Sequence, residues 1–205
     1  MDKKTIQEKR KRGYFIEAAK KIIREEGTQK LTVKKVADRA GFAPGTLYNY
    51  FSDLNALYGY CVEDFWQECE EKVINNTSNE ENSVEKIIKA CNAYVSYFFD
   101  NPNVFKLIFL EDFKDIPEEI KEEVYDPEVV KLLGKYLKEA SQSESIKGKN
   151  EDQVESIIAN YLHGILLFYI MDRAAESREK IMADLKNNIE FILHASESSS
   201  FSLKD

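Results

Sequence analysis

Residues 31–51 read LTVKKVADRAGFAPGTLYNYF, and this stretch carries the strongest structural pattern in the N-terminal part of the chain. It opens with Thr32, a residue type that caps helix N-termini, and apolar residues then recur at helical spacing up to Gly41. Pro44 follows a tight link and stands where a first helical position tolerates proline. The stretch therefore predicts one helix of about nine residues and, after a tight turn, a second short helix.

The segments on either side add two longer helices. Residues 15–26 carry an apolar stripe and end at Gly27, and Asp53 is placed to cap a long helix that runs to about Val73. Two short helices joined by a turn that contains glycine, and braced by a longer preceding helix, are typical of a helix-turn-helix. A generic three-helix bundle shares this pattern, so the spacing alone leaves both interpretations open.

The side chains that lie off the apolar faces favour DNA binding. The exposed side of the first short helix carries Lys34, Lys35 and Arg39. The second short helix begins with small, hydrogen-bonding and aromatic residues and no acid, namely Pro44, Gly45, Thr46, Tyr48 and Asn49. Small residues permit close approach to a groove, and hydroxyl and amide groups can contact phosphates and base edges.

The same residues carry a resemblance to a known family. Over about residues 12–60 the chain closely resembles the N-terminal DNA-binding signature of the TetR family of transcriptional repressors. The matching positions are Leu31, Thr32, Val33, Val36, Ala37, Ala40, Gly41, Phe42, Gly45, Thr46, Leu47, Tyr48, Asn49, Tyr50, Phe51 and Leu57. The resemblance implies an all-helical homodimer whose variable C-terminal domain binds a small inducer.

The resemblance also implies roles for single residues. Thr32, Tyr48 and Tyr50 would contact the DNA backbone or its edge. The residues implied to lie nearest the bases are Lys34, Pro44, Gly45, Thr46 and Asn49, with a further contribution from Tyr48.

Three positions depart from the family pattern. Ala43 stands where a serine often precedes the third helix, so this helix has no side-chain cap and relies on Pro44 for its start. Leu54 stands where a lysine commonly grips a phosphate, and the basic arm at residues 9–12 is expected to supply the missing charge. The carboxylate of Asp53 is expected to face the amides of its own helix rather than DNA.

Charge is distributed unevenly along the chain. The total is −8, but residues 1–60 hold 13 Lys and Arg against 7 Asp and Glu, whereas the rest holds 16 against 30. The basic N-terminal part, residues 1–60, is called the basic head here, and it is the part expected to face DNA phosphates, because the acidic remainder would be repelled by them.

No apolar segment follows the basic run of the first twelve residues, and no stretch reaches the roughly 18 to 20 apolar residues of a membrane span, so the sequence predicts a cytoplasmic protein. The chain has three cysteines, Cys61, Cys69 and Cys91, and an odd number cannot all be paired. They are expected to be buried free thiols.

Helical periodicity continues to the end of the chain. Apolar stripes predict helices over 84–98, 104–110, 127–140, 154–171 and 177–195, with a polar connector at 75–83, short acidic helices or a loop over 111–128, a second connector at 141–152 and a frayed tail over 196–205. The predicted fold is all-α, with an N-terminal three-helix helix-turn-helix domain followed by a helical ligand-binding and dimerisation domain. The DNA-binding domain is expected at residues 1–52, with its basic arm at 1–12, and the effector-binding and dimerisation domain at 53–205.

The segment 154–171 is apolar on two faces, so two layers of neighbours must cover it. In the resembling family the last two helices pair with their copies in a four-helix bundle, and the two-faced helix gives an independent reason to expect the same pairing here. A central place for this helix in the core of a monomer is the alternative. The expected interface residues are Gly164, Leu167, Met171, Leu185 and Ile189.

Aromatic residues are dense between positions 58 and 113, which suits either an apolar effector cavity or a helical core. In proteins of the resembling family the helices that carry six of these or nearby aromatic residues pack together, so the resemblance implies that these six bind the effector. They are Trp66, Tyr94, Phe98, Phe109, Tyr125 and Tyr161.

The remaining chemistry of the sequence argues against an enzyme. The two histidines, His163 and His194, are too few for a histidine-based metal centre, and His163 is expected at the dimer seam or in the core. No glycine-rich phosphate loop and no nucleophile, histidine and acid set is present, so no metal, cofactor or catalytic residue is expected. The sequence predicts a homodimeric repressor that binds a double-stranded DNA operator and a small apolar or aromatic effector. The alternatives are a DNA-bound regulator that recruits a protein partner through the acidic segment 111–128, and a helical enzyme or lipid carrier with a vestigial DNA-binding domain.

Overall fold

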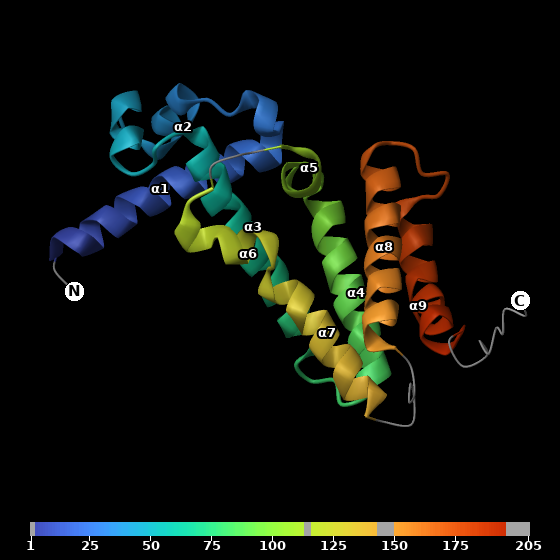
Figure 1. Ribbon diagram of the computed structural model, residues 1–205. Coiled ribbons are helices and arrows are strands. Elements are labelled where there is room, and N and C mark those ends of the chain that lie inside the picture. The colour runs from blue at the N-terminus through green and yellow to red at the C-terminus, as the bar shows by residue number, and fades with distance from the viewer. Residues whose placement is uncertain (1–2, 113–115, 143–149, 196–205) are drawn as a thin grey trace, which may run out of the picture. The chain divides into compact units, whose positions relative to one another are not determined.

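The computed structural model describes residues 3–112, 116–142 and 150–195, and within these ranges every regular element is a helix (Figure 1). The all-α prediction is therefore confirmed. None of the helices in the described ranges combines the length and the apolar character that crossing a bilayer requires. The predicted tail over 196–205 lies outside the described residues.

The chain divides into two compact units, Met1–Glu68 with Asn101–Pro127, and Cys69–Asp100 with Glu128–Asp205. One helix, α3 (Leu54–Thr77), begins in the first unit and ends in the second. The functional boundary expected between residues 52 and 53 falls just before this helix and stays a prediction.

The first unit holds the elements around residues 31–51. These are α1 (Lys3–Glu26), the 3₁₀ helix η1 (Thr28–Lys30), α2 (Val33–Ala40), the 3₁₀ helix η2 (Pro44–Asn49), the first part of α3, α5 (Pro102–Leu110), the 3₁₀ helix η3 (Glu118–Ile120) and α6 (Lys121–Tyr125). Helix α1 packs against α2 and α5. Its apolar stripe is buried, with Phe15, Ile22 and Ile23 fully covered, as the spacing predicted.

Helix α1 is longer than the sequence predicted. Its apolar stripe starts at Phe15, but the helix begins at Lys3 and includes the basic arm. Lysine, arginine and glutamine are good helix formers without any apolar stripe, so the arm continues the helix that Phe15 anchors. The helix ends before Gly27, whose φ of +81° with ψ of 171° belongs to a region that glycine alone enters freely.

The second unit is a set of packed helices with one shared core. It contains the end of α3, α4 (Ser83–Asp100), α7 (Glu128–Ser141), α8 (Glu151–Ile170) and α9 (Arg178–Ala195). Helix α4 packs against α7, α8 and α9, and α8 also packs against α7 and α9. Figure 1 shows α8 and α9 side by side. All five of these segments were predicted as helices.

Candidate functional site

The helix-turn-helix is fixed by a cap at each end of α2. The hydroxyl of Thr32 accepts the N–H of Lys35 at 3.2 Å, which satisfies one of the free amides of the first turn. At the other end Gly41 adopts a left-handed conformation with φ of +80°, and the N–H of Phe42 bonds to the carbonyl of Ala37 at 2.9 Å. The turn to the next helix therefore depends on the glycine that the sequence marked as a stop.

The short helix predicted after the turn is present, and it is of the 3₁₀ type. Ala43 offers no side-chain cap, and the N–H of Thr46 bonds to the carbonyl of Ala43 at 2.9 Å. A six-residue element that contains proline and glycine and lacks a cap has little to favour the longer i to i+4 ladder. Leu47 is fully buried and anchors the element to the core of the first unit.

The side chains expected to contact DNA lie mainly on the surface. Among them Thr32, Lys34, Pro44, Gly45, Tyr48 and Asn49 are exposed, whereas Thr46 and Tyr50 are half-buried. The ring of Tyr48 is 58% exposed, and no described aromatic ring packs on it. The ring of Tyr50 instead lies 5.8 Å from that of Phe15 and so supports the domain from within.

The three basic residues of α2 differ in how their charge is used. Lys35 is paired with Glu26, and a guanidinium nitrogen of Arg39 lies 2.7 Å and 2.8 Å from the two carboxylate oxygens of Glu25. Lys34 makes no ion pair with any described residue. Of the three cations, Lys34 is therefore the one whose charge no acid of α1 neutralises.

The carboxylate of Asp53, which lies between η2 and α3, points toward the start of α3. The Oδ1 atom of Asp53 accepts the N–H of Ala56 at 2.9 Å, which is the N-cap that the sequence predicted. This carboxylate is occupied by its own helix.

A buried charge cluster joins α1 to the first part of α3. Lys20 is 5% exposed, and its Nζ atom lies 3.0 Å from Asp64 and 2.9 Å from Glu68. Burial lowers the pKa of Lys20, but the hydrogen bonds and charges of Glu68 and Asp64 outweigh it and hold that pKa well above its usual range. Arg24 adds an ion pair to Glu68 and a 3.0 Å hydrogen bond to the side chain of Asn101. The helix-turn-helix and the first part of α3 are thus held together inside the first unit.

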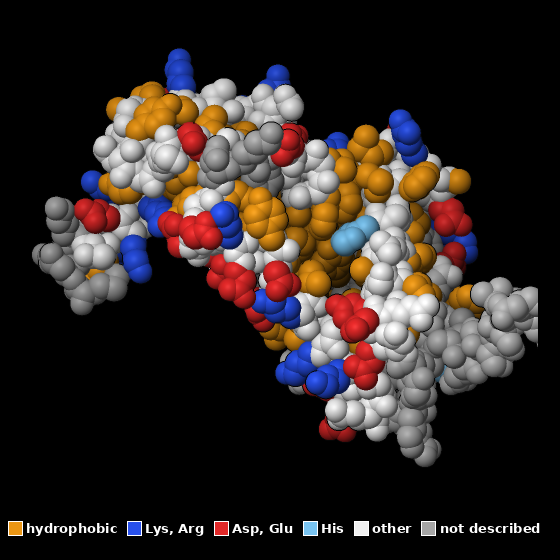
Figure 2. Space-filling view, viewed as in Figure 1, with side chains coloured by type: hydrophobic (Ala, Val, Ile, Leu, Met, Phe, Trp, Pro, Cys, Tyr) orange, Lys and Arg blue, Asp and Glu red, His pale blue; other side chains and the backbone are white. Residues whose placement is uncertain are grey.

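A second contact joins the basic arm to the acidic segment. The guanidinium of Arg12 stacks over the ring of Tyr60 at 3.6 Å from its centroid, and the Tyr60 hydroxyl donates to Glu119 at 2.6 Å. The acids of η3 and α6 are otherwise exposed, and acidic side chains gather over α6 on the face that Figure 2 shows. The prediction of short acidic helices over 111–128 is confirmed for the described residues.

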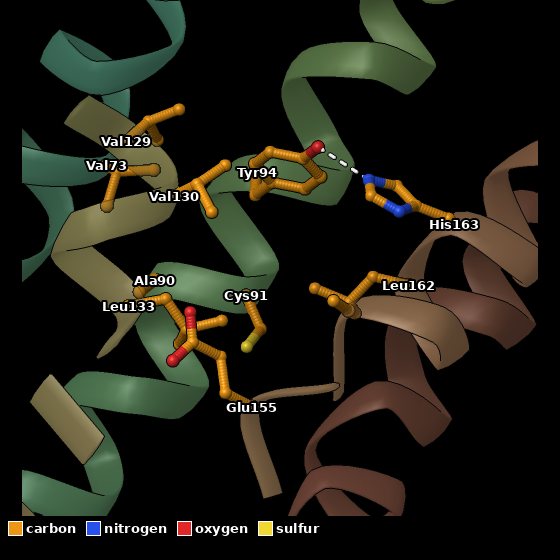
Figure 3. A pocket seen from close by; sticks show the side chains of 11 residues that line it. Val73, Ala90, Cys91, Tyr94, Val129, Val130, Leu133, Glu155, Leu162 and His163 are labelled. Carbon is orange, nitrogen blue, oxygen red and sulfur yellow. Dashed lines mark hydrogen bonds between the residues drawn. The ribbon is translucent and has the colours of Figure 1, made fainter. Parts of the chain in front are cut away.

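The second unit contains an apolar pocket of about 70 Å³ between α3, α4, α7 and α8 (Figure 3). Its walls are formed by Val73, Ala90, Cys91, Tyr94, Val129, Val130, Leu133, Glu155, Ala159, Leu162 and His163. Each of the helices α4, α7 and α8 contributes residues three and four positions apart, so one face of each helix borders the same space.

One hydrogen-bonded pair lies at one end of this pocket. The Tyr94 hydroxyl and the Nε2 atom of His163 are 2.9 Å apart. Burial lowers the pKa of His163, and burial together with Cys69 raises that of Tyr94 well above its usual range. Both groups are therefore neutral at physiological pH, and the pair offers a hydrogen bond without a charge.

Of the six residues expected to bind the effector, Tyr94 is the one that lines this pocket. Phe98 is fully buried beside it, with the ring centroids 5.0 Å apart, and Tyr161 accepts a 2.8 Å hydrogen bond from Asn188. The other three belong to the first unit. There Trp66 donates to the carbonyl of Val124 at 3.3 Å and packs on Phe109, whereas Tyr125 is 68% exposed. Their role in binding stays a prediction, and the geometry brings together a different set.

Sequence reasoning missed most of the pocket wall. It favoured aromatic residues, but the wall is mainly aliphatic and carries Glu155, Cys91 and His163 as its chemically distinctive groups. His163 was expected at a dimer seam or in a core, and the structure places it half-buried at the pocket. A signal was present in the spacing of Glu155, Ala159, Leu162 and His163 along one helix face.

The outer faces of α8 and α9 differ from the expected dimer interface in two positions. Leu167 and Met171 are exposed, and Gly164 is half-buried, so a partner could reach them. Leu185 and Ile189 have no exposed surface, because the stripe to which they belong faces the core of its own unit. The structure assigns these two residues to the protomer core. Further large apolar side chains are exposed on the same two helices, namely Ile157 and Phe168 on α8 and Phe191 on α9.

Comparison with known proteins finds a family model that matches the N-terminal part of the chain. Residues 15–61 match the family described as bacterial regulatory proteins, tetR family. No curated protein matches the chain. The expected helix-turn-helix domain at the N-terminus, followed by a helical domain, is confirmed.

Solved structures share the fold over most of the chain. A transcriptional regulator FadR from Bacillus subtilis, in complex with stearoyl-CoA, has a TM-score of 0.70 at 20% identity, over 88% of this chain and 97% of its own. The fatty acid degradation regulator FadR from Bacillus halodurans has a TM-score of 0.69 at 18% identity, over 90% and 95%. A TetR family transcription regulator from Marinobacter aquaeolei VT8 has a TM-score of 0.65 at 17% identity, over 92% and 97%. Each likeness establishes a shared fold.

Proposed function

We propose that this chain, whose residues 15–61 match the tetR family of bacterial regulatory proteins, is a cytoplasmic homodimeric repressor. It binds a pseudo-palindromic DNA operator and is released by a small apolar ligand. The observation that carries the proposal is the surface of the helix-turn-helix. Its tip presents Lys34, Tyr48 and Asn49 to solvent while Leu47 and the cap of Thr32 hold the backbone in place.

The roles of single residues follow from their chemistry and exposure. Lys34 and Asn49 are suited to base edges, since ammonium and amide groups recognise guanine and adenine in the major groove. Thr32 and Tyr48 supply hydroxyls for phosphate oxygens. Gly45 and Pro44 add little bulk, which lets η2 approach the groove closely. Thr46 and Tyr50, which are half-buried, are proposed at the edge of the contact.

Dimerisation is proposed through the outer faces of α8 and α9. Large apolar side chains are exposed at Leu167 and Phe168 on α8, at Met171 directly after it, and at Phe191 on α9. Burial of such surface is the main driving force of association. Half-buried Gly164 would let the two copies of α8 approach. A twofold pair would present two reading surfaces to half-sites about 34–36 Å apart.

The pocket of the second unit is the proposed effector site. Its apolar wall suits the hydrocarbon part of a ligand, and ligand-responsive relatives of this fold include the FadR protein solved with stearoyl-CoA. At about 70 Å³ the pocket is smaller than the roughly 300 Å³ or more that drug-sized ligands occupy. A ligand must therefore part α4, α7 and α8 and will bind a widened conformer more tightly than this one.

The widened conformer is proposed to have a lower affinity for DNA. Helix α3 carries Val73 in the pocket wall, and its first part is tied to α1 through Asp64 and Glu68. A shift of α3 would therefore change the position of α2 and η2, the two elements proposed to contact DNA. Because a dimer must match two half-sites on one duplex, a shift of a few ångströms is sufficient to weaken binding.

The proposal is tested by selection from a pool of random double-stranded DNA with the purified full chain. We expect enrichment of an inverted repeat whose half-sites are one helical turn apart. Binding of the enriched duplex, followed by fluorescence anisotropy, should weaken when an apolar ligand is added. Failure to enrich any sequence would contradict the assignment as a sequence-specific regulator.

A further inference from the structure

The charge on the pocket wall distinguishes between classes of ligand. Among the described residues that line the wall, Glu155 is the one that carries a charge at neutral pH, because burial keeps His163 neutral and none of these residues is a lysine or an arginine. From this part of the wall an anionic ligand would meet a carboxylate of its own sign and no cation. A cationic ligand would meet an opposite charge.

The position of Glu155 is built into the packing of two helices. Its side chain lies against the backbone of α7 at Gly134, where an added Cβ atom would stand 2.9 Å from one carboxylate oxygen. Glycine at this position therefore leaves the space that the carboxylate occupies. In Figure 3 Glu155 lies at the opposite end of the labelled residues from the hydrogen bond between Tyr94 and His163, with Cys91, Leu133 and Leu162 between them.

Among the described residues, none compensates the charge of Glu155. It makes no ion pair or hydrogen bond with any described residue, and the charged neighbour that acts on it is a further acid, Asp152. Partial burial and the charge of Asp152 raise the pKa of Glu155. A carboxylate that is partly desolvated and beside a like charge gains more from a bound cation than a fully hydrated one does.

We infer, on the basis of the proposed effector site, that the ligand is an amphiphile with a protonated amine, seated with its ammonium at Glu155 and its hydrocarbon chain directed toward Tyr94 and His163. The two ends are eight residues apart on α8, which corresponds to about 12 Å along the helix axis. An alkyl chain of about eight carbons has a similar length. This ligand class differs from the acyl-CoA bound by the related Bacillus subtilis protein, since that ligand is anionic.

The inference is tested with three probes of equal chain length and different head groups: octylammonium, octanol and octanoate. Their binding to the full chain is measured by titration calorimetry at neutral pH, below the concentrations at which they aggregate. We expect octylammonium to bind at least about tenfold more tightly than octanol, and octanoate to bind most weakly. Octylammonium should also release the selected DNA at the lowest concentration.

Two variants locate the preference. Glu155→Gln should abolish the advantage of octylammonium over octanol and leave the affinity for octanol within about twofold. Glu71→Gln makes the same change of charge at an exposed position of α3 outside the pocket and should retain the full preference. A preference that survives Glu155→Gln would overturn the inference.

The probes separate this inference from the proposed effector site. Binding of octanol without a preference for octylammonium would reject the cationic ligand and retain an apolar pocket. Binding of none of the three would reject the pocket as the effector site, and the DNA selection described above would still test the regulator by itself.

Discussion

The Nζ atom of Lys20 on α1 lies 2.9 Å from a carboxylate oxygen of Glu68 on α3, with Asp64 at 3.0 Å from the same ammonium. The lysine is nearly inaccessible, whereas the two acids keep about a third of their side-chain surface exposed. Removal of the ammonium would leave two neighbouring carboxylates in mutual repulsion. Since water still reaches the acids, the effect is smaller than for a fully buried pair.

Lys20→Met should therefore lower the free energy of unfolding by about 1–3 kcal/mol, as measured by urea denaturation. Lys21→Met, which removes an exposed lysine from the same helix, should change it by less than about 0.5 kcal/mol. Equal stability of the two variants would show that the cluster of Lys20, Asp64 and Glu68 does not hold α1 against α3.

Lys34 and Lys35 are adjacent on α2 but differ in their ion pairs, and this makes them a matched pair for DNA binding. Lys34→Ala should weaken binding to the selected duplex by about 1–3 kcal/mol and relax the preference at one base position, since Lys34 has no acidic partner among the described residues. Lys35→Ala should cost less than about 1 kcal/mol, because Glu26 already neutralises Lys35. Anisotropy titrations measure both, and equal losses would argue against a specific role for Lys34.

DNA binding should depend steeply on salt. If the basic head neutralises about six phosphates, affinity should fall on the order of 10³-fold between 50 and 200 mM salt. The same titrations in a salt series give the slope. A flat response would be inconsistent with binding through the basic head.

Leu167 tests the proposed dimer interface. A glutamate at this position would place a charge in an apolar contact, so Leu167→Glu should give monomers in analytical ultracentrifugation. Ile74→Glu is the matched control, because Ile74 on α3 is 41% exposed against 38% for Leu167 and lies outside the proposed interface. A dimer that tolerates Leu167→Glu would move the interface to another surface.

His163 predicts a pH dependence of stability. Burial lowers the pKa of His163, so the folded state binds a proton there less readily than the unfolded state, whose histidine titrates near pH 6.5. The contribution of the neutral ring to stability is complete above about pH 6.5 and is lost as the pH falls toward the lower folded value. The melting temperature should fall more steeply from pH 7 to 5 in the parent chain than in His163→Gln. If the melting temperatures of the two proteins fell in parallel with pH, His163 would not be the source of the pH dependence.

The caps and turns of the helix-turn-helix could be predicted from the sequence. Thr32, Gly41 and Asp53 each have a local role that short-range chemistry determines, and all three have that role in the structure. The full length of α1 could not be predicted from periodicity, because residues 3–12 have no apolar stripe. The sequence did not specify the type of η2, because the choice between 3₁₀ and α depends on small energies at an uncapped start.

The pocket could not be derived from periodicity. A stripe such as Leu185 and Ile189 shows that a helix buries one face, but it does not show whether that face meets its own core or another copy. The walls of the pocket come from four helices, and their common space exists only once the helices pack. Large aromatic side chains such as Phe98 and Trp66 went into the interior of their own units, while Glu155 reached the pocket because Gly134 left room beside it.

The three buried cysteines make this chain convenient for distance measurement. Cys61, Cys69 and Cys91 are all inaccessible, and burial raises the pKa of Cys91 to about 12, so its reactive thiolate is scarce at neutral pH. A cysteine introduced by Lys30→Cys, on the exposed end of η1, would thus react with a maleimide label faster than the three buried thiols. Spin labels or dyes attached there, one per protomer, would allow the distance between the two helix-turn-helix domains of a dimer to be measured as a ligand is added.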